Sequence, residues 1–417
     1  MELQKSSVNT ILNTIVIVAA LGYFVDVYDL VLFLIIGRDS LVDIGIPEAL
    51  KVEKFIYLLN VQMIGMLIGG LIWGILGDKK GRLSVLFGSI LVYSLANIAN
   101  GFVSEIAALL NMDPMTTYSI LRFIAGFGLA GELGAGITLV SEVMSKENRG
   151  YGTMVVASVG VTGAVVAYLV GNFLGWQVTY FVGGGLGLSL LLLRLGVFES
   201  SIFEKLHDSK VQRGNFFALF KNKAIAFKYI NCILIGLPVW FVIGILIARA
   251  PSYASVFGIL GIDDKFCVML CYTGLIFGDI SSGVLSQYLK SRIKVFYIFY
   301  GLCTLIIVLY LNLNGASSTL FYSFITALGF SVGFWAIFVT MASEQFGANL
   351  RATATTTVPN FVRGSLVPLS LLFDFFMRKY GILQAGYIVA AITMGISLLA
   401  LCNLKDTFGK DLDYIEE

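Results

Sequence analysis

Twelve apolar segments, each long enough to cross a lipid bilayer, define this chain. A helix needs about 20 apolar residues to span the hydrocarbon core. Such segments lie near residues 11–36, 54–77, 84–105, 116–142, 151–175, 176–196, 225–249, 266–289, 294–313, 319–345, 353–377 and 382–402. Only 13% of the residues are charged and 58% are hydrophobic, whereas soluble domains carry about 25% charged residues. Because no water-soluble fold could bury so much apolar surface, the sequence predicts an all-α membrane protein with twelve transmembrane helices.

Internal repetition and one polar interruption divide the twelve segments into two halves. A Ser-Glu pair at 141–142, with an arginine at 149, recurs 202 residues later at 343–344 and 351. A weaker repeat relates GILGD at 74–78 to GVLSQ at 283–287. Related halves are typical of transporters built around a central site. We predict an N-terminal six-helix bundle at 1–196, a cytoplasmic central loop at 197–224 and a C-terminal six-helix bundle at 225–417.

Lysine and arginine are distributed unevenly between the two sides of the predicted membrane. If both termini are cytoplasmic, the cytoplasmic segments hold 19 of the 28 basic residues and the outer loops hold 7. An excess of positive charge is typical of cytoplasmic loops. We therefore expect an integral plasma (inner) membrane protein with both termini in the cytoplasm. A net charge of only +2 gives no reason to expect a nucleic-acid partner. The expected partners are the lipid bilayer and a small-molecule substrate, and the expected state is a monomer.

Three motifs resemble those of a known transporter family. Residues 74–82, GILGDKKGR, resemble the G-x-L-x-D-[RK]-x-G-R signature of the major facilitator superfamily. Residues 122–132, RFIAGFGLAGE, resemble the helix 4 pattern of its metabolite:proton symporter, sugar and organic-ion branches. Residues 22–29, GYFVDVYD, resemble the helix 1 acid of the same branches. The resemblance implies two pseudo-symmetric bundles that rock about a site lined chiefly by helices 1, 4, 7 and 10.

The resemblance also implies a latch at the cytoplasmic face. In the family, the acid that corresponds to Asp78 meets the start of helix 11, where the positive end of a helix dipole favours an anion. Gln287 replaces the acid in the second half, so we expect an asymmetric latch. The residues predicted for this latch, and excluded from the substrate site, are Asp78, Arg82, Glu142, Arg149, Glu344 and Arg351.

Two acids and one arginine form an outer tier of charge within the predicted spans. Asp29 and Arg122 each lie ~10 Å below the outer surface, if a helix rises about 1.5 Å per residue, so an ion pair between them is allowed. Asp26 is one turn from Asp29. Two carboxylates cannot both be neutralised by one arginine, so one of them should carry a proton. Because the chain's one histidine, His207, lies in the polar central segment, Asp26, Asp29 and Arg122 are the predicted proton-coupling residues. A fixed structural salt bridge is the alternative.

A second tier, formed by Glu132, Asp279 and Arg363, lies near the midplane, where transporter sites are usually found. Arg363 can clamp a substrate carboxylate with two hydrogen bonds. Glu132 or Asp279 can hold a substrate ammonium or carry the coupling proton. The alternative is that Arg363 only pairs with one of these acids and holds helices together. Further candidates for substrate contact are Tyr23, Gln62, Asn231, Trp240, Trp335 and Asn360.

These observations favour a proton-coupled symporter that imports a small polar organic solute, such as an amino acid or organic acid, by alternating access. A sugar or nucleoside porter and a non-transporting receptor on the same scaffold are the alternatives. A channel would need a continuous polar pore. The sequence lacks the G-x4-G-K-[ST] loop of ATP-driven proteins. No nucleophile–base pair or metal-ligand cluster suggests an enzyme or a metal site, and protons are the one coupling species expected.

Overall fold

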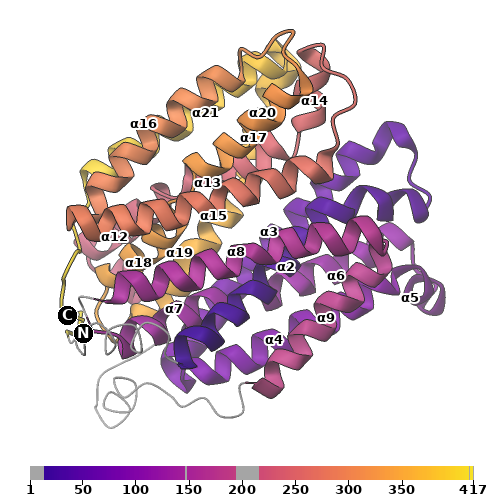
Figure 1. Cartoon of the computed structure of the whole chain (residues 1–417). Helices are drawn as coiled ribbons and strands as arrows, with labels where there is room; N and C mark the ends of the chain where they lie inside the picture. Colours follow the sequence, from indigo (N-terminus) through magenta and orange to yellow (C-terminus); the bar gives the residue numbers. More distant parts are fainter. Residues whose placement is uncertain (1–13, 146–147, 194–215, 413, 417) are drawn as a thin grey trace, which may run out of the picture.

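The computed structural model describes residues 14–145, 148–193, 216–412 and 414–416, apart from the side chains of 14, 15 and 82. Twelve helical spans are long and apolar enough to cross a membrane, and no strand occurs among the described residues. Figure 1 shows them as two bundles that lie side by side, one for each half of the sequence. The predicted fold class is therefore confirmed. Most of the predicted central loop, residues 197–215, lies outside the described residues.

Each half contributes six spans, several of them built from more than one helix. The N-terminal half comprises α2 (Thr14–Asp43), α3 (Glu48–Lys80), α4 (Arg82–Gly101), α6 (Pro114–Leu129) with α7 (Glu132–Val143), α8 (Arg149–Phe173) and α9 (Trp176–Leu193), with α5 (Val103–Leu110) outside the spans. The C-terminal half comprises α12 (Lys223–Leu234) with α13 (Leu237–Phe241) and η2 (Val242–Ile247), α15 (Asp264–Leu289), α16 (Arg292–Tyr310), α17 (Ser318–Ser331) with α18 (Trp335–Gln345), α19 (Arg351–Gly364) with α20 (Leu366–Tyr380), and α21 (Ile382–Cys402). Short α11 (Ala218–Lys221) and α14 (Ala250–Val256) precede the seventh and eighth spans.

The first two helices extend further than their apolar segments predict. Helix α2 continues to Asp43 instead of residue 36, and α3 starts at Glu48 instead of residue 54. Apolar composition reports the thickness of the hydrocarbon core, whereas a helix ends only where the backbone changes course. Here that change occurs at Gly45, which has a φ of +84°. Arg38 and Asp39 therefore lie on a rigid helix and not in a loop.

Four spans are interrupted, which the apolar pattern does not predict. Span 4 breaks between α6 and α7, span 7 between α12 and α13, span 10 between α17 and α18, and span 11 between α19 and α20. At the break in span 10, Gly333 lies so close to Gly278 of α15 that an added Cβ would be 2.4 Å from its Cα. Broken helices near the midplane present backbone ends and side chains to a central site.

Candidate functional site

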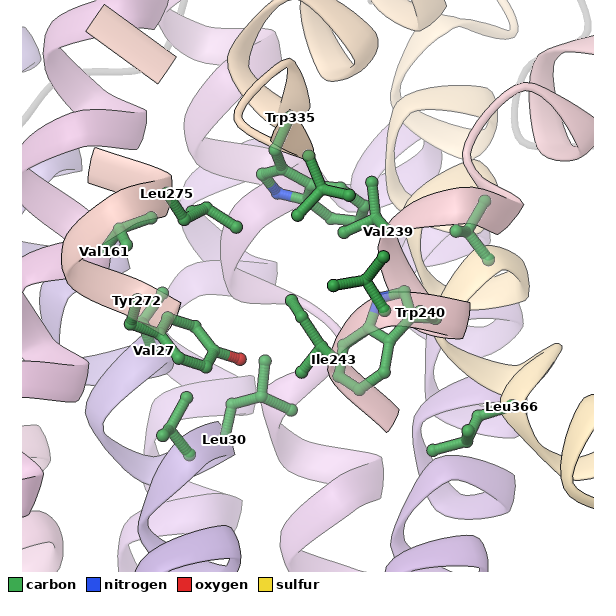
Figure 2. Packing of buried hydrophobic residues seen from close by; sticks show 14 of the residues in the cluster. Val27, Leu30, Val161, Val239, Trp240, Ile243, Tyr272, Leu275, Trp335 and Leu366 are labelled. Atoms are coloured by element: carbon green, nitrogen blue, oxygen red, sulfur yellow. The ribbon is translucent and has the colours of Figure 1, made fainter. Parts of the chain in front are cut away.

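A small cavity lies where the two halves meet. Figure 2 shows apolar side chains of both halves, including Val27, Leu30, Trp240 and Trp335, converging on it. Its volume is about 20 Å³, and its lining consists of Tyr23, Val27, Leu30, Val161, Val239, Trp240, Ile243, Tyr272, Leu275, Trp335 and Arg363. A space of this size holds about one water molecule, so it cannot hold an organic solute without expanding.

Arg363 is the charged group of this cavity, and Asp26 is its partner. Arg363 Nη2 lies 3.5 Å from Asp26 Oδ2, and both side chains are buried. This ion pair lacks hydrogen-bond geometry, and Arg363 Nε and Nη2 have no hydrogen-bond partner among the described residues. Arg363 Nη1 donates to Asn360 Oδ1 at 3.3 Å, and the guanidinium lies 5.7 Å from the Trp335 ring centroid. Arg363 is thus held by an ion pair, one hydrogen bond and a ring contact, and its Nε remains without a hydrogen-bond partner among the described residues.

The alternative considered from the sequence was that Arg363 pairs with Glu132 or Asp279, whereas the ion pair in the structure is with Asp26. Asp26 lies on α2, the first span. Because residues 26 and 29 differ by about 60° around the helix, Asp26 and Asp29 face different neighbours. Depth along a helix did not reveal this rotation. Glu132, at the start of α7, acts on Asp26 electrostatically. Asp279 Oδ1 accepts a hydrogen bond from the backbone N–H of Ala336, at the start of α18, at 3.0 Å.

The remaining outer-tier residues form a polar cluster inside the N-terminal half. The Arg122 side chain donates to Gln62 Oε1, and its guanidinium lies 4.6 Å from the Phe33 ring centroid. Its charge acts on Asp29, but the two do not form the ion pair that was considered from the sequence. Neither oxygen of Asp29 has a hydrogen bond of good geometry among the described residues. The proton-coupling candidates are therefore divided, with Asp26 at the cavity and Asp29 beside Arg122.

The other sequence candidates separate into two groups. Tyr23, Trp240 and Trp335 line the cavity. Asn360 does not line the cavity. Its side-chain amide donates a hydrogen bond to the Ala130 carbonyl at 2.8 Å, and this bond joins α19 to the break in span 4. Asn231 donates to the Phe227 carbonyl of its own helix at 2.8 Å and does not line the cavity.

Tyr272 of α15 lines the cavity and was missed in the sequence analysis. It lies seven residues before Asp279 on the same helix. Residues seven apart share one face of a helix, so this spacing was the available signal.

Asp78 caps the start of α19 at the end of the molecule that is predicted to face the cytoplasm. Its carboxylate accepts hydrogen bonds from the backbone N–H of Ala352 at 3.2 Å and of Thr353 at 2.8 Å. This geometry matches what the resemblance implied for helix 11. In the other half, Gln287 lies beside Gly150 at the start of α8, and its Nε2 has no hydrogen-bond partner among the described residues. The two ends of the pseudo-symmetric contact are thus unequal, as expected.

The repeated Ser-Glu-Arg pattern forms reciprocal contacts between the halves, which we call the inner gate (Glu142, Arg149, Glu344 and Arg351). Arg149 Nη1 lies 3.7 Å from Glu344 Oε1, and Arg351 Nη1 lies 3.3 Å from Glu142 Oε1. Arg292, which the sequence analysis did not select, also pairs with Glu344, at 3.1 Å. Each half therefore supplies the arginine that pairs with the glutamate of the other half. The side chain of Arg82 lies outside the described part of the structure.

Residues 403–412 and 414–416 lie across the inner gate as a strap, which the sequence did not predict. The Arg149 guanidinium donates to the Lys410 carbonyl at 3.3 Å, and that of Arg351 donates to the Leu412 carbonyl at 2.5 Å. Asp406 anchors the strap by accepting a hydrogen bond from the Ser291 hydroxyl. Burial acts to raise the pKa of Asp406, but this hydrogen bond and others from backbone N–H groups hold the pKa below its usual value. The anchor is therefore ionised at neutral pH.

The opposite end is also closed, by contacts that we call the outer clasp (Arg38, Asp39, Asp264 and Lys265). Arg38 pairs with Asp264, and Lys265 Nζ lies 2.5 Å from Asp39 Oδ2. Both pairs join α2 of the N-terminal half to α15 of the C-terminal half. The inner gate and the outer clasp are both formed, so ion pairs join the two halves at both ends of the molecule.

The Asp78 contact predicts an effect on the balance between open and closed states. Asp78→Asn should weaken closure of the inner end by about 1–3 kcal/mol, because it removes a charged acceptor from a helix N-terminus. Spin labels at S145C and K290C, both exposed sites near that end, should then report a larger population of long distances. Intrinsic substrate affinity should change little. Asp264→Asn at the outer clasp is the matched control and should not lengthen this distance. An unchanged distance distribution in Asp78→Asn would count against the latch.

Comparison with known proteins assigns the family. Residues 13–365 match the sequence profile of the Major Facilitator Superfamily. The chain is similar to a putative niacin/nicotinamide transporter of Bacillus subtilis (strain 168), with 26% identity over 397 residues that cover 92% of each protein. It is also similar to a sialic acid transporter of Escherichia coli (strain K12), with 23% identity over 395 residues, covering 92% of this chain and 91% of that protein.

The fold is similar to that of a solved structure. The proton:xylose symporter XylE, bound to 6-bromo-6-deoxy-D-glucose, superposes with a TM-score of 0.78 and covers 98% of each chain at 15% identity. At this identity the likeness concerns the fold alone. The profile match extends over most of the sequence, and the related proteins are transporters and not enzymes. The chain belongs to the major facilitator superfamily and is an integral membrane transporter.

Proposed function

We propose that this protein is a proton-coupled symporter that imports small organic acids across the plasma membrane, with both termini in the cytoplasm. The observation that carries the proposal is the ion pair between Arg363 and Asp26 at the central cavity. It joins a helix of one half to a helix of the other, and it leaves arginine donors without hydrogen bonds. A guanidinium in this state is suited to exchange one carboxylate for another.

Exchange of carboxylates links the substrate to a proton. While Asp26 is ionised, it neutralises Arg363, and a buried arginine without a counter-charge would be strongly destabilised. When Asp26 takes up a proton, it no longer neutralises Arg363, and the guanidinium is free to bind a substrate carboxylate. The substrate anion and the proton therefore occupy the site together, which is the requirement for symport. Asp29, close to Arg122, is the second place where a proton could reside.

The gates supply alternating access. Substrate enters when the Arg38–Asp264 and Lys265–Asp39 pairs of the outer clasp separate, and it leaves when the inner gate and the Asp78 contact separate. A cavity of about 20 Å³ has to expand during each passage. Because the clasp and the gate join the same two halves at opposite ends, a rocking motion opens one end while the other stays closed.

The related proteins support an acid as the substrate. One is named a putative niacin/nicotinamide transporter and another a sialic acid transporter. Niacin and sialic acid each carry one carboxylate, which is the group that we propose Arg363 binds, whereas nicotinamide carries an uncharged amide. An amino acid would also need an acidic side chain for its ammonium, and Asp26, the acid that pairs with Arg363, carries the proton in this proposal.

Uptake into liposomes tests the proposal. Purified protein in vesicles should accumulate a radiolabelled carboxylate when the outside is made acidic, and a protonophore should abolish the accumulation. Liposomes with Arg363→Ala correct for passive diffusion of the protonated acid. A receptor on the same scaffold would bind the ligand without flux. Accumulation that does not respond to the pH gradient would contradict proton coupling.

A further inference from the structure

The walls of the central cavity are mainly aromatic and aliphatic. Tyr23, Trp240, Tyr272 and Trp335 contribute four aromatic rings, and valine, leucine and isoleucine complete most of the wall. Arg363 is the one charged side chain among the described residues that line it. Such a wall offers contact with ring faces, one positive charge, and the O–H and N–H groups at the edges of the tyrosine and tryptophan rings.

This lining argues against three classes of solute. A sugar or nucleoside needs several donors and acceptors for its hydroxyl groups, and the described lining contains no Asn, Gln, Ser or Thr. A dicarboxylate would bury its second charge without a second cation, which is strongly unfavourable. Neither candidate amide lines the cavity: Gln62 accepts from Arg122, and Asn360 donates to the Ala130 carbonyl.

The indole groups supply an independent observation. The Nε1 atom of Trp240 is buried and has no hydrogen-bond partner among the described residues, whereas the Trp335 indole interacts with the Tyr23 side chain. Both side chains line the cavity from the C-terminal half (Figure 2). An unsatisfied buried donor destabilises a folded protein, so a donor at a cavity wall is suited to an acceptor on a ligand.

We infer that the substrate is a small aromatic monocarboxylate with a hydrogen-bond acceptor on its ring, an inference that rests on the acid transport proposed above. Its carboxylate replaces Asp26 on Arg363. Its ring lies beside Trp335, which already contacts the guanidinium, and faces Trp240 and Tyr272. The Trp240 N–H donates to the ring acceptor. Because a benzene-sized ligand needs a cavity of about 150 Å³, the ring enters only after one end of the protein has opened.

Matched ligands test this inference by calorimetry on the purified full chain. Benzoate should bind roughly tenfold more tightly than cyclohexanecarboxylate, which has the same charge and a similar size but no aromatic face. Benzamide, which has the ring without the charge, should bind far more weakly than benzoate. Pyridine-3-carboxylate should bind more tightly than benzoate because its ring nitrogen accepts a hydrogen bond.

Variants assign the effect to the cavity. Trp240→Phe keeps a ring but removes the N–H, so the preference for pyridine-3-carboxylate over benzoate should disappear. Trp335→Leu should remove the preference for benzoate over cyclohexanecarboxylate. If the Trp335→Leu protein does not fold, Trp335→Phe is measured in its place. Trp73→Phe is the control, since the Trp73 N–H donates to the Phe127 carbonyl at 2.8 Å, away from the cavity.

The outcomes separate the two levels of the proposal. Equal affinity for benzoate and cyclohexanecarboxylate in the wild-type protein overturns the aromatic inference and leaves acid transport standing. Equal affinity for benzoate and benzamide, or no binding of any carboxylate, overturns the proposed function itself.

Discussion

Arg363→Lys should weaken binding of a carboxylate substrate by about 1–3 kcal/mol, and Arg363→Ala should abolish it. A lysine ammonium keeps the positive charge but cannot make the planar two-bond contact that a guanidinium makes with a carboxylate. The expected loss is large because the guanidinium is buried, and its Nε and Nη2 are without hydrogen bonds in the closed state. Calorimetry on purified protein measures this loss, with thermal unfolding as the check that each variant is folded.

Arg249 provides a matched control for the arginine substitution. Its Nη2 lies 2.9 Å from Asp374 Oδ1, and its guanidinium lies 4.9 Å from the Phe373 ring centroid, so it too is a buried arginine with one acid and one ring. It does not line the cavity. Arg249→Lys should leave substrate affinity unchanged. If folded Arg363→Lys binds a carboxylate with wild-type affinity, Arg363 is only a structural partner of Asp26.

Asp26→Asn should abolish uphill accumulation while leaving counterflow exchange of the substrate. An asparagine mimics the protonated acid, so Arg363 stays available for substrate but no proton can be released. Substrate binding should therefore lose its dependence on pH in this variant, whereas binding to the wild-type protein should strengthen as the pH falls. Uptake in liposomes with and without a pH gradient measures the first effect, and calorimetry at several pH values measures the second.

Asp29→Asn distinguishes the two carboxylates that the sequence proposed together. Asp29 lies next to Gly183 of α9, inside the N-terminal half, and not at the cavity. If Asp29 carries the coupling proton, Asp29→Asn will lose accumulation while Asp26→Asn keeps it, and the ion pair of Asp26 with Arg363 is then structural. Normal proton-driven accumulation by both variants would contradict the assignment of the proton to either residue.

The sequence by itself determined the twelve spans, the two related halves and which charged residues gather at the inner end. The thickness of a bilayer fixes the length of each apolar segment, so the spans can be counted without a structure. The latch at Asp78 was also readable, because a short turn joins two spans and the resemblance placed its acid at a helix start. The repeated pattern of Glu142 with Arg149 and Glu344 with Arg351 indicated contact residues, since related halves meet about a common axis.

Only the tertiary structure decided which charges meet inside the membrane. Asp26 and Asp29 are three residues apart, yet one faces Arg363 of the other half and the other faces the interior of its own half. Their depth follows from the sequence, but their neighbours depend on how each helix is rotated and where spans 4, 7, 10 and 11 are broken. Those features arise from packing between segments far apart in the chain, such as Gly278 against Gly333. Apolar composition carries no record of them, because lipid-facing and buried surfaces of a membrane helix are equally apolar.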